Sequence, residues 1–179
     1  MLKMFLKIFS ISKKTKQVDP SDCKQADLID IGEKIQSKIN KLYKGSIAIR
    51  QVDAGSDNAC EQELVALSNA YYDIERFGIH FVASPKHADV LLVTGPVTRN
   101  MAEAVKRAYQ ATPAPKLVVT VGDDAADGGI FMNSYAVQDG VSAVIPVDYH
   151  IPGDPPSPQT ILCHFLKMLE MLEGKKQAK

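Results

Sequence analysis

The sequence predicts an α/β fold: a three-layer sandwich with a parallel sheet between helices, preceded by an N-terminal amphipathic helix. Short strands rich in β-branched residues alternate with helical stretches, which is typical of strand–helix–strand units joined by right-handed crossovers. Two segments, 88–95 and 116–122, are apolar without alternation, as expected for strands covered on both faces. A length of 179 residues with 45% hydrophobic content suffices for one domain with a sizeable core.

Residues 1–17 differ in composition from the rest of the chain. They carry five lysines and no acidic residue, and a helix would place Lys3 and Lys7 on one face and Leu2 and Phe5 on another. We expect this helix to lie at a membrane interface or against an apolar partner surface. A targeting peptide and a frayed end are the alternatives.

The next stretch combines a linker with a helix. Pro20 interrupts any preceding helix, and residues 18–30 are mostly polar. From Leu28 to Tyr43 the apolar residues recur at steps of three and four, which predicts an amphipathic helix that ends at Gly45. The expected organisation is an amphipathic segment at 1–17, a linker and helix at 18–45, the α/β domain at 46–172 and a charged tail at 173–179.

The α/β domain is assigned from its alternating segments. The β-branched and apolar runs predict strands, of which the second is a brief extended piece: 46–52, 79–83, 88–95, 116–122 and 143–148. Residues 63–72 are expected to be helical, with Leu64, Leu67 and Tyr71 on one side. Two further helices are expected at Arg99–Ala111 and Thr160–Leu172.

Charge and cysteine content exclude several classes of protein. The 21 basic residues balance the 21 acidic ones, whereas a nucleic-acid-binding protein normally has a basic excess. The three cysteines are too few and too scattered for a disulfide framework, which favours a reducing compartment. No apolar run reaches the roughly 20 residues that a membrane-spanning helix needs.

Aspartates stand in the loops that follow three of the predicted strands. These loops hold Asp57 with Cys60, then Asp124, then Asp154, each beside glycine. Sites of open α/β sheets lie beyond the carboxyl ends of the strands, so the four side chains are expected to converge. The alternative is that each aspartate caps a turn or the start of a helix.

Four long strings of the sequence resemble one known family, the small subunits of membrane-bound, energy-converting [NiFe] hydrogenases of the formate hydrogenlyase and hydrogenase-4 type. The same family includes the 20 kDa subunit of respiratory complex I. The resemblance covers about residues 46–172 and is carried by RQVDAGSDNACEQE, YYDIERFGIHFVASPKHADVLLVTGPVTRNM, VVTVGDDAADGGIF and IPGDPPSP.

The resemblance implies a flavodoxin-like subunit with one [4Fe–4S] cluster. Its implied partners are a large hydrogenase-like subunit similar to the 49 kDa subunit of complex I, membrane-arm subunits and a ferredoxin-like subunit, with no nucleic acid. The implied location is peripheral, on the cytoplasmic face of the cell membrane.

The sequence departs from the family pattern at the cluster ligands. The family has cysteine where this chain has Asp57, Asp124 and Asp154, so Cys60 alone keeps a ligand sulfur. Iron–sulfur clusters are held by thiolates, usually four, and hard carboxylate oxygens match iron–sulfide poorly. We therefore expect no cluster of this subunit's own.

Three roles are open for the aspartates. They could form a hard-cation site with Asp57, Asp124 and Asp154 as ligands. They could hold protons, because clustered carboxylates raise one another's pKa. They could also be structural, hydrogen-bonded to loop amides or paired with Arg50 or Arg99.

A second set of residues is implied by the resemblance to lie near the large subunit, with packing in the core as the alternative: Glu61, Tyr72, Asp73, Glu75, Arg76 and Phe77. Two functions follow. One is a subunit without a cluster that acts in assembly, or in coupling the large subunit to the membrane arm. The other is an oxidoreductase subunit that still binds an iron–sulfur cluster and transfers electrons.

Overall fold

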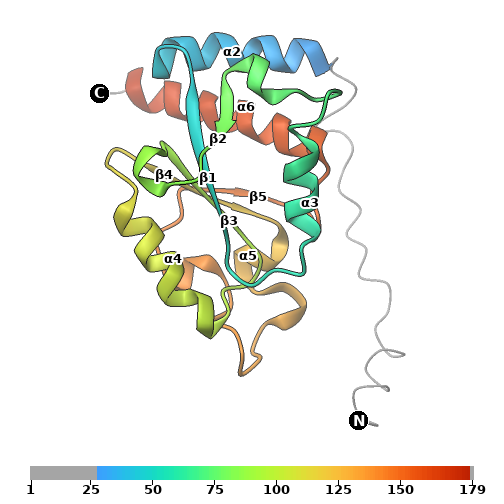
Figure 1. Cartoon of the computed structure of the whole chain (residues 1–179), viewed down its shortest axis with the longest axis vertical. Coiled ribbons are helices and arrows are strands. Elements are labelled where there is room, and N and C mark those ends of the chain that lie inside the picture. The colour runs from blue at the N-terminus through green and yellow to red at the C-terminus, as the bar shows by residue number, and fades with distance from the viewer. Residues whose placement is uncertain (1–27, 178–179) are drawn as a thin grey trace.

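The structure is a computed structural model that describes residues 28–177. A five-stranded parallel sheet runs through it in the order β2-β1-β3-β4-β5, with helices on both faces (Figure 1). The strands are β1 (Ile47–Asp53), β2 (Ile79–Phe81), β3 (Val90–Thr94), β4 (Leu117–Val121) and β5 (Tyr149–Ile151). The predicted flavodoxin-like α/β sandwich is confirmed, whereas the helix expected at 1–17 lies outside the described residues.

Two separate cores bind the helices to the sheet. On one face, α2 (Leu28–Tyr43), α3 (Ala59–Ala66) and α6 (Pro158–Gln177) bury their apolar residues against alternate residues of the strands. On the other face, α4 (Arg99–Ala111) and the short α5 (Asp123–Asp127) pack against the remaining strand residues. β3 and β4 are buried along their entire length, which explains why their sequences do not alternate.

The fifth strand does not lie where the sequence predicts it. Residues 143–148 contain no strand, and the strand that pairs with β4 is Tyr149–Ile151. Val141 and Ile145 are instead buried in the core under α4, and Val141–Ala143 forms the short 3-10 helix η4. Pro146 has no N–H to donate to a sheet, so this apolar stretch serves as core without pairing.

Two helices also differ from their predicted bounds. α3 begins at Ala59 and ends at Ala66, so the helix expected at 63–72 is wrong in its second half. The Asn69 side chain accepts hydrogen bonds from the N–H groups of Tyr71 and Tyr72, and this Asx turn replaces the helix. α6 continues beyond the predicted Leu172 to Gln177.

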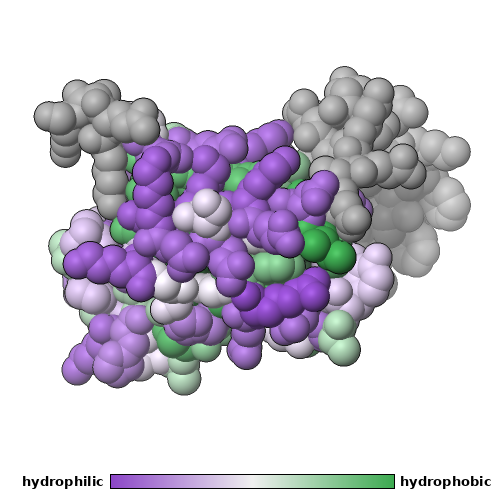
Figure 2. Space-filling view, turned by 90° about the horizontal axis from the view of Figure 1, so that it is seen from above, coloured by the Kyte–Doolittle hydropathy of each residue, from purple (hydrophilic) through white to green (hydrophobic). Residues whose placement is uncertain are grey.

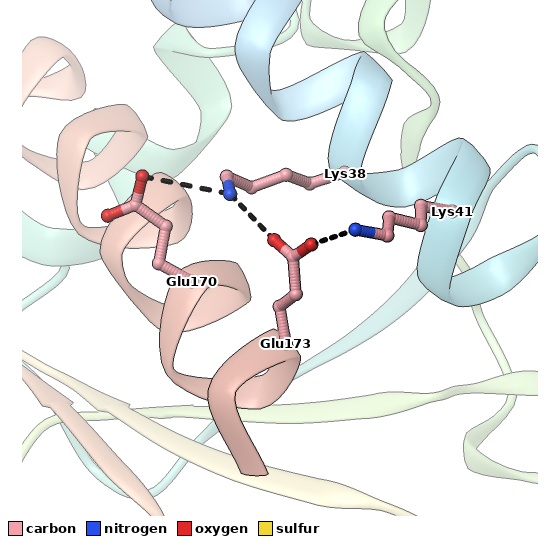
Figure 3. A network of polar contacts seen from close by, with 4 residues as sticks. All are labelled: Lys38, Lys41, Glu170 and Glu173. Carbon is pink, nitrogen blue, oxygen red and sulfur yellow. Dashed lines mark hydrogen bonds and ion pairs between the residues drawn. The ribbon is translucent and has the colours of Figure 1, made fainter. Parts of the chain in front are cut away.

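The C-terminal part of α6 forms ion pairs with α2. The Nζ atom of Lys38 lies 2.9 Å from Glu173 Oε2 and 3.8 Å from Glu170 Oε1, and Lys41 also bonds to Glu173 (Figure 3). The face of the molecule above α2 is mostly hydrophilic (Figure 2). Within residues 28–177, no helix is long and apolar enough to cross a bilayer.

The pair of lysines makes the stability of the fold depend on pH. Hydrogen bonds from Lys41 and then Lys38 lower the pKa of Glu173 from 4.5 to about 2. A lowered carboxyl pKa stabilises the fold above the unfolded value, and that stabilisation is lost as the pH falls from about 4.5 toward 2. Glu173→Gln should therefore lower the thermal unfolding midpoint near neutral pH, and the loss should shrink as the pH falls through this range.

The matched control is Glu170→Gln. The Glu170 side chain is 54% exposed and lies 3.8 Å from Lys38, so its removal should change the midpoint less. Thermal unfolding of both variants and the parent, followed by circular dichroism across this pH range, measures the difference. A loss in Glu173→Gln that stays constant with pH would contradict the assignment.

Candidate functional site

The loops at the carboxyl ends of β4 and β5 are joined directly to each other. The N–H of Gly122 donates to Ile151 O (2.9 Å), and the N–H of Asp123 donates to Gly153 O (2.8 Å). In addition, the Asp123 carboxylate accepts the N–H of Gly153 at 3.0 Å. We call these three hydrogen bonds the β4–β5 clasp. They hold the loop after β5, which contains Asp154, beside the loop after β4, which contains Asp124.

Cys60 lies on the same end of the sheet, in the first turn of α3. Its side chain is buried, and its Sγ lies over Gly122, where an added Cβ would be 2.6 Å from the sulfur. Gly122 has a φ of +92°, so the position favours glycine for its backbone as well as for its lack of a side chain. The sulfur is therefore held against the β4 loop.

The electrostatic surroundings of Cys60 are strongly negative. Burial and the nearby charge of Glu61, followed by those of Asp154, Asp57 and Asp124, raise the pKa of the thiol to about 12. The structure thus brings the four predicted side chains close enough to act on one another. At neutral pH the Cys60 sulfur is a protonated thiol.

The three aspartates differ in exposure and in partners. Asp57 is exposed, and its Oδ1 accepts the N–H of Ala59 (2.9 Å) at the start of α3. Asp124 is 8% exposed, and its Oδ1 has no hydrogen-bond partner. Asp154 is exposed. Asp57 therefore acts as a turn-capping group, whereas Asp124 is a buried carboxyl with one unpaired oxygen.

Burial and mutual repulsion favour the protonated acids. The pKa of Asp124 is raised by burial, then by the charges of Asp154 and Asp57, while a hydrogen bond from the Ile130 N–H lowers it. The pKa of Asp154 is raised by partial burial, then by the charges of Asp123 and Asp57. No ion pair joins Arg50 or Arg99 to these aspartates within residues 28–177, so compensation by arginine is not observed.

Metal-binding geometry is a separate question from electrostatic proximity. In the described part of the chain, no group of three or more His, Cys, Asp or Glu side chains is arranged to hold a metal ion. Cys163, the other cysteine of this part, lies on α6 and is not one of the predicted ligand positions.

Several residues at this end of the sheet were not predicted from the sequence. Asp123 fastens the two loops, and its Oδ1 lies 3.9 Å from Nε2 of His150. Thr94, buried at the end of β3, donates a hydrogen bond to Glu61 Oε1, while Glu61 Oε2 is buried without a partner. A threonine that ends an otherwise apolar buried strand was the signal that could have identified the Thr94 contact.

The predicted contact residues divide between core and surface. Phe77 is buried under α2, where an added Cβ on Gly32 would lie 2.0 Å from its ring. The guanidinium of Arg76 stacks on the outer side of that ring at 4.5 Å from its centre. Tyr72, Asp73, Glu75 and Arg76 remain half-buried or exposed, and their role at an interface stays a prediction.

Sequence comparison identifies relatives over most of the chain. Residues 58–168 match the family model described as NADH ubiquinone oxidoreductase, 20 Kd subunit. The chain is 42% identical over 145 residues to formate hydrogenlyase subunit 7 of Escherichia coli, which covers 81% of this chain and 57% of that protein. It is 41% identical over 140 residues to a probable membrane-bound hydrogenase subunit of Pyrococcus furiosus, covering 78% and 84%.

Solved structures agree with these matches. A chain of the membrane-bound sulfane sulfur reductase, an archaeal respiratory membrane complex, is 33% identical with a TM-score of 0.66, over 76% of this chain and 75% of that one. A chain of an NAD⁺-reducing [NiFe]-hydrogenase is 18% identical with a TM-score of 0.54, over 70% and 92%, and it supports the fold alone.

These relatives confirm the resemblance found in the sequence. They are subunits of membrane-bound hydrogenase or reductase complexes, and the match spans somewhat more than half of the E. coli relative. The chain belongs to the family of the 20 kDa subunit of NADH:ubiquinone oxidoreductase, in the branch of the energy-converting, membrane-bound hydrogenase small subunits.

Proposed function

We propose that this chain is a subunit of a membrane-bound, hydrogenase-type complex that has no [4Fe–4S] cluster of its own. It acts in assembly, or in coupling a large subunit similar to the 49 kDa subunit of complex I to membrane-arm subunits. A ferredoxin-like subunit belongs to the same complex, and the chain lies peripherally on the cytoplasmic face of the membrane. The observation that carries the proposal is the donor set around Cys60.

That donor set does not fit an iron–sulfur cluster. A [4Fe–4S] cluster is held by thiolates, and the position expected for it offers one sulfur with three carboxylates. Burial and the neighbouring acids raise the pKa of that thiol to about 12, which opposes the deprotonation that ligation requires. Hard oxygen donors of Asp57, Asp124 and Asp154 do not replace soft thiolates at an iron–sulfide core.

Protonation of two acids and hydrogen bonds from loop amides can stabilise this site without a cluster. The raised pKa values of Asp124 and Asp154 favour their neutral forms, which repel each other less than two carboxylates. Asp57 accepts the N–H of Ala59 in its own loop, and Asp123 accepts the N–H of Gly153 from the loop after β5. Hydrogen bonds of Gly122 and Asp123 join the loops after β4 and β5, and Asp124 and Asp154 lie near Cys60 as acids whose neutral forms are favoured.

An exposed apolar loop supports docking of a partner at this end of the molecule. Gly129 lies against Asp124, and the residues that follow it include Ile130 at 83% and Tyr135 at 88% exposure. Phe131 and Met132 between them are also exposed. Large apolar groups concentrated beside a site indicate a surface that another protein covers.

The first test is the iron content of the complex. We expect that anaerobically purified complex, with its native partners, shows the same EPR signals after dithionite reduction whether it carries the parent chain or Cys60→Ala. Iron and acid-labile sulfide should also be unchanged, with Cys163→Ala as the matched control. Loss of about four iron and four sulfide specifically in Cys60→Ala would show a cluster here and revive electron transfer as the function.

Restoring cysteines tests whether the number of thiol ligands is limiting. Asp154→Cys alone should bind no cubane cluster after reconstitution with iron and sulfide, because two oxygen positions remain. The triple variant Asp57→Cys, Asp124→Cys and Asp154→Cys should acquire one, visible by EPR after reduction. A cubane signal from the single variant, or none from a folded triple variant, would contradict this account of the site.

The protonation of Asp124 is tested by pH. A carboxyl with a raised pKa stabilises the fold below its unfolded value and costs stability as the pH rises through the folded value. Asp124→Asn removes that charge, so the thermal midpoint of the variant should rise relative to that of the parent as the pH increases above about 4. Asp30→Asn, on the exposed side of α2, is the control, and parallel pH curves for Asp124→Asn and parent would exclude the mechanism.

A further inference from the structure

The edge of the sheet is incomplete beside the second half of β1. β2 pairs with β1 only from Ile47 to Ile49, opposite Ile79 to Phe81, whereas β1 continues to Asp53 in its pairing with β3. Figure 1 shows β1 running on past the tip of β2. A cavity of about 460 Å³ lies at this position, which we call the β1 notch, lined by Arg50, Gln51, Asp53, Phe81, Val82 and Ala83.

The backbone of β1 directs hydrogen-bonding groups into the notch. Ile47 N–H donates to Gly78 O, and Ile49 O accepts from Val82 N–H, both at 2.8 Å, so alternate residues from Ile47 onward face the β2 side. By this alternation the N–H and C=O groups of Gln51 and Asp53 face the same side. Within residues 28–177 no backbone group bonds to them there.

The side chains around the notch leave one charge uncompensated. Asp53 Oδ1 accepts the N–H groups of Gly55 (2.7 Å) and Ser56 (2.9 Å), so this carboxylate is occupied by its own turn. The Arg50 guanidinium forms no ion pair or side-chain hydrogen bond with any residue of 28–177. Phe81 and Val82 add a half-buried apolar wall.

We propose that the β1 notch binds an extended segment of a partner protein, which adds to the sheet as a strand beside Gln51 and Asp53 and places a carboxylate against Arg50. Strand addition supplies the missing hydrogen bonds to the open edge, and the side-chain pockets select the sequence. Residues in register on neighbouring strands share a face of the sheet, so an acidic residue opposite Arg50 meets the guanidinium. This inference does not depend on whether the subunit holds a cluster.

Charge and sequence pattern argue for a partner over the start of the chain itself. Residues 1–17 carry five lysines and no acid, so they offer no carboxylate for Arg50. Residues 18–27 contain three aspartates, but these stand among polar residues and Pro20 and not in an alternating apolar strand. The occupant expected from the notch has the opposite character: an alternating apolar and polar strand with a central glutamate.

The test uses the full chain and the peptide acetyl-Thr-Val-Glu-Val-Thr-amide. Hydrogen exchange followed by NMR should show fast exchange of the Gln51 and Asp53 amides in the free chain and slower exchange with peptide, while Ile47, already bonded, changes little. Arg50→Glu should weaken binding roughly tenfold or more, as loss of a charge-assisted hydrogen bond does. Lys106→Glu, on exposed α4, makes the same charge change and should have no effect.

Peptide variants separate the two parts of the proposal without altering the fold. An N-methylated peptide should not bind, because it cannot donate hydrogen bonds to the edge of β1. A peptide with lysine in place of glutamate should bind the parent chain weakly, no better than the glutamate peptide binds the Arg50→Glu variant. Protection of Gln51 and Asp53 in the free, dilute chain would mean that the chain fills its own notch and would overturn the proposal. Protection that grows with protein concentration alone would assign the notch to a second copy, and equal binding of the N-methylated peptide would exclude strand addition.

Discussion

β3 and β4 are completely buried, so every backbone N–H and C=O group in them needs a partner inside the protein. The parallel sheet meets this requirement only if β1 and β5 flank them in register, with helices covering both faces. Parallel pairing in turn places the carboxyl ends of the strands at one edge. The meeting of the loops that carry Asp57, Asp124 and Asp154 is thus a consequence of how the two central strands are buried.

The acids and the thiol at this edge lie close enough to disfavour ionisation of Cys60, Asp124 and Asp154. Burial and then the neighbouring negative charges raise the pKa of the Cys60 thiol to about 12, and the same two causes raise the pKa values of Asp124 and Asp154. Loop amides compensate only part of this effect, since Asp124 Oδ1 has no partner.

The periodicity of the sequence was sufficient to predict the sheet, α2 and α4, because the spacing of apolar residues follows directly from burial on one or both faces of an element. It failed at 143–148, where the residues are apolar because they fill the core under α4 and not because they pair as a strand. It also failed at the end of α3, where the side chain of Asn69 decides the turn. Local hydrogen bonds and a proline outweighed the apolar pattern in both places.

The sequence predicted that these side chains converge, but not how they are hydrogen-bonded. Glycine and aspartate after three of the predicted strands indicated convergence. No pattern in the sequence, however, distinguishes Asp124, buried with an unpaired Oδ1, from its neighbour Asp123, which joins the β4 loop to the β5 loop. Pairwise contacts between loops that are 30 residues apart depend on the strand register. The β1 notch could not be predicted from the sequence for the same reason, since it arises from the unequal lengths of β1 and β2.

The notch and the acidic site are connected through the end of β1. Asp53 closes the turn that leads to Asp57, and Ser56 of that turn lies against Gly95, where an added Cβ would be 2.4 Å from the serine side chain. The carboxylate of Asp57 then accepts the N–H of Ala59, the first residue of α3, and this helix carries Cys60. A strand bound beside Gln51 and Asp53 would therefore restrain the one loop of the site that the β4–β5 clasp does not hold. Occupation of the notch and ordering of the Asp57 loop are expected to favour each other, because each reduces the conformational freedom that the other must remove.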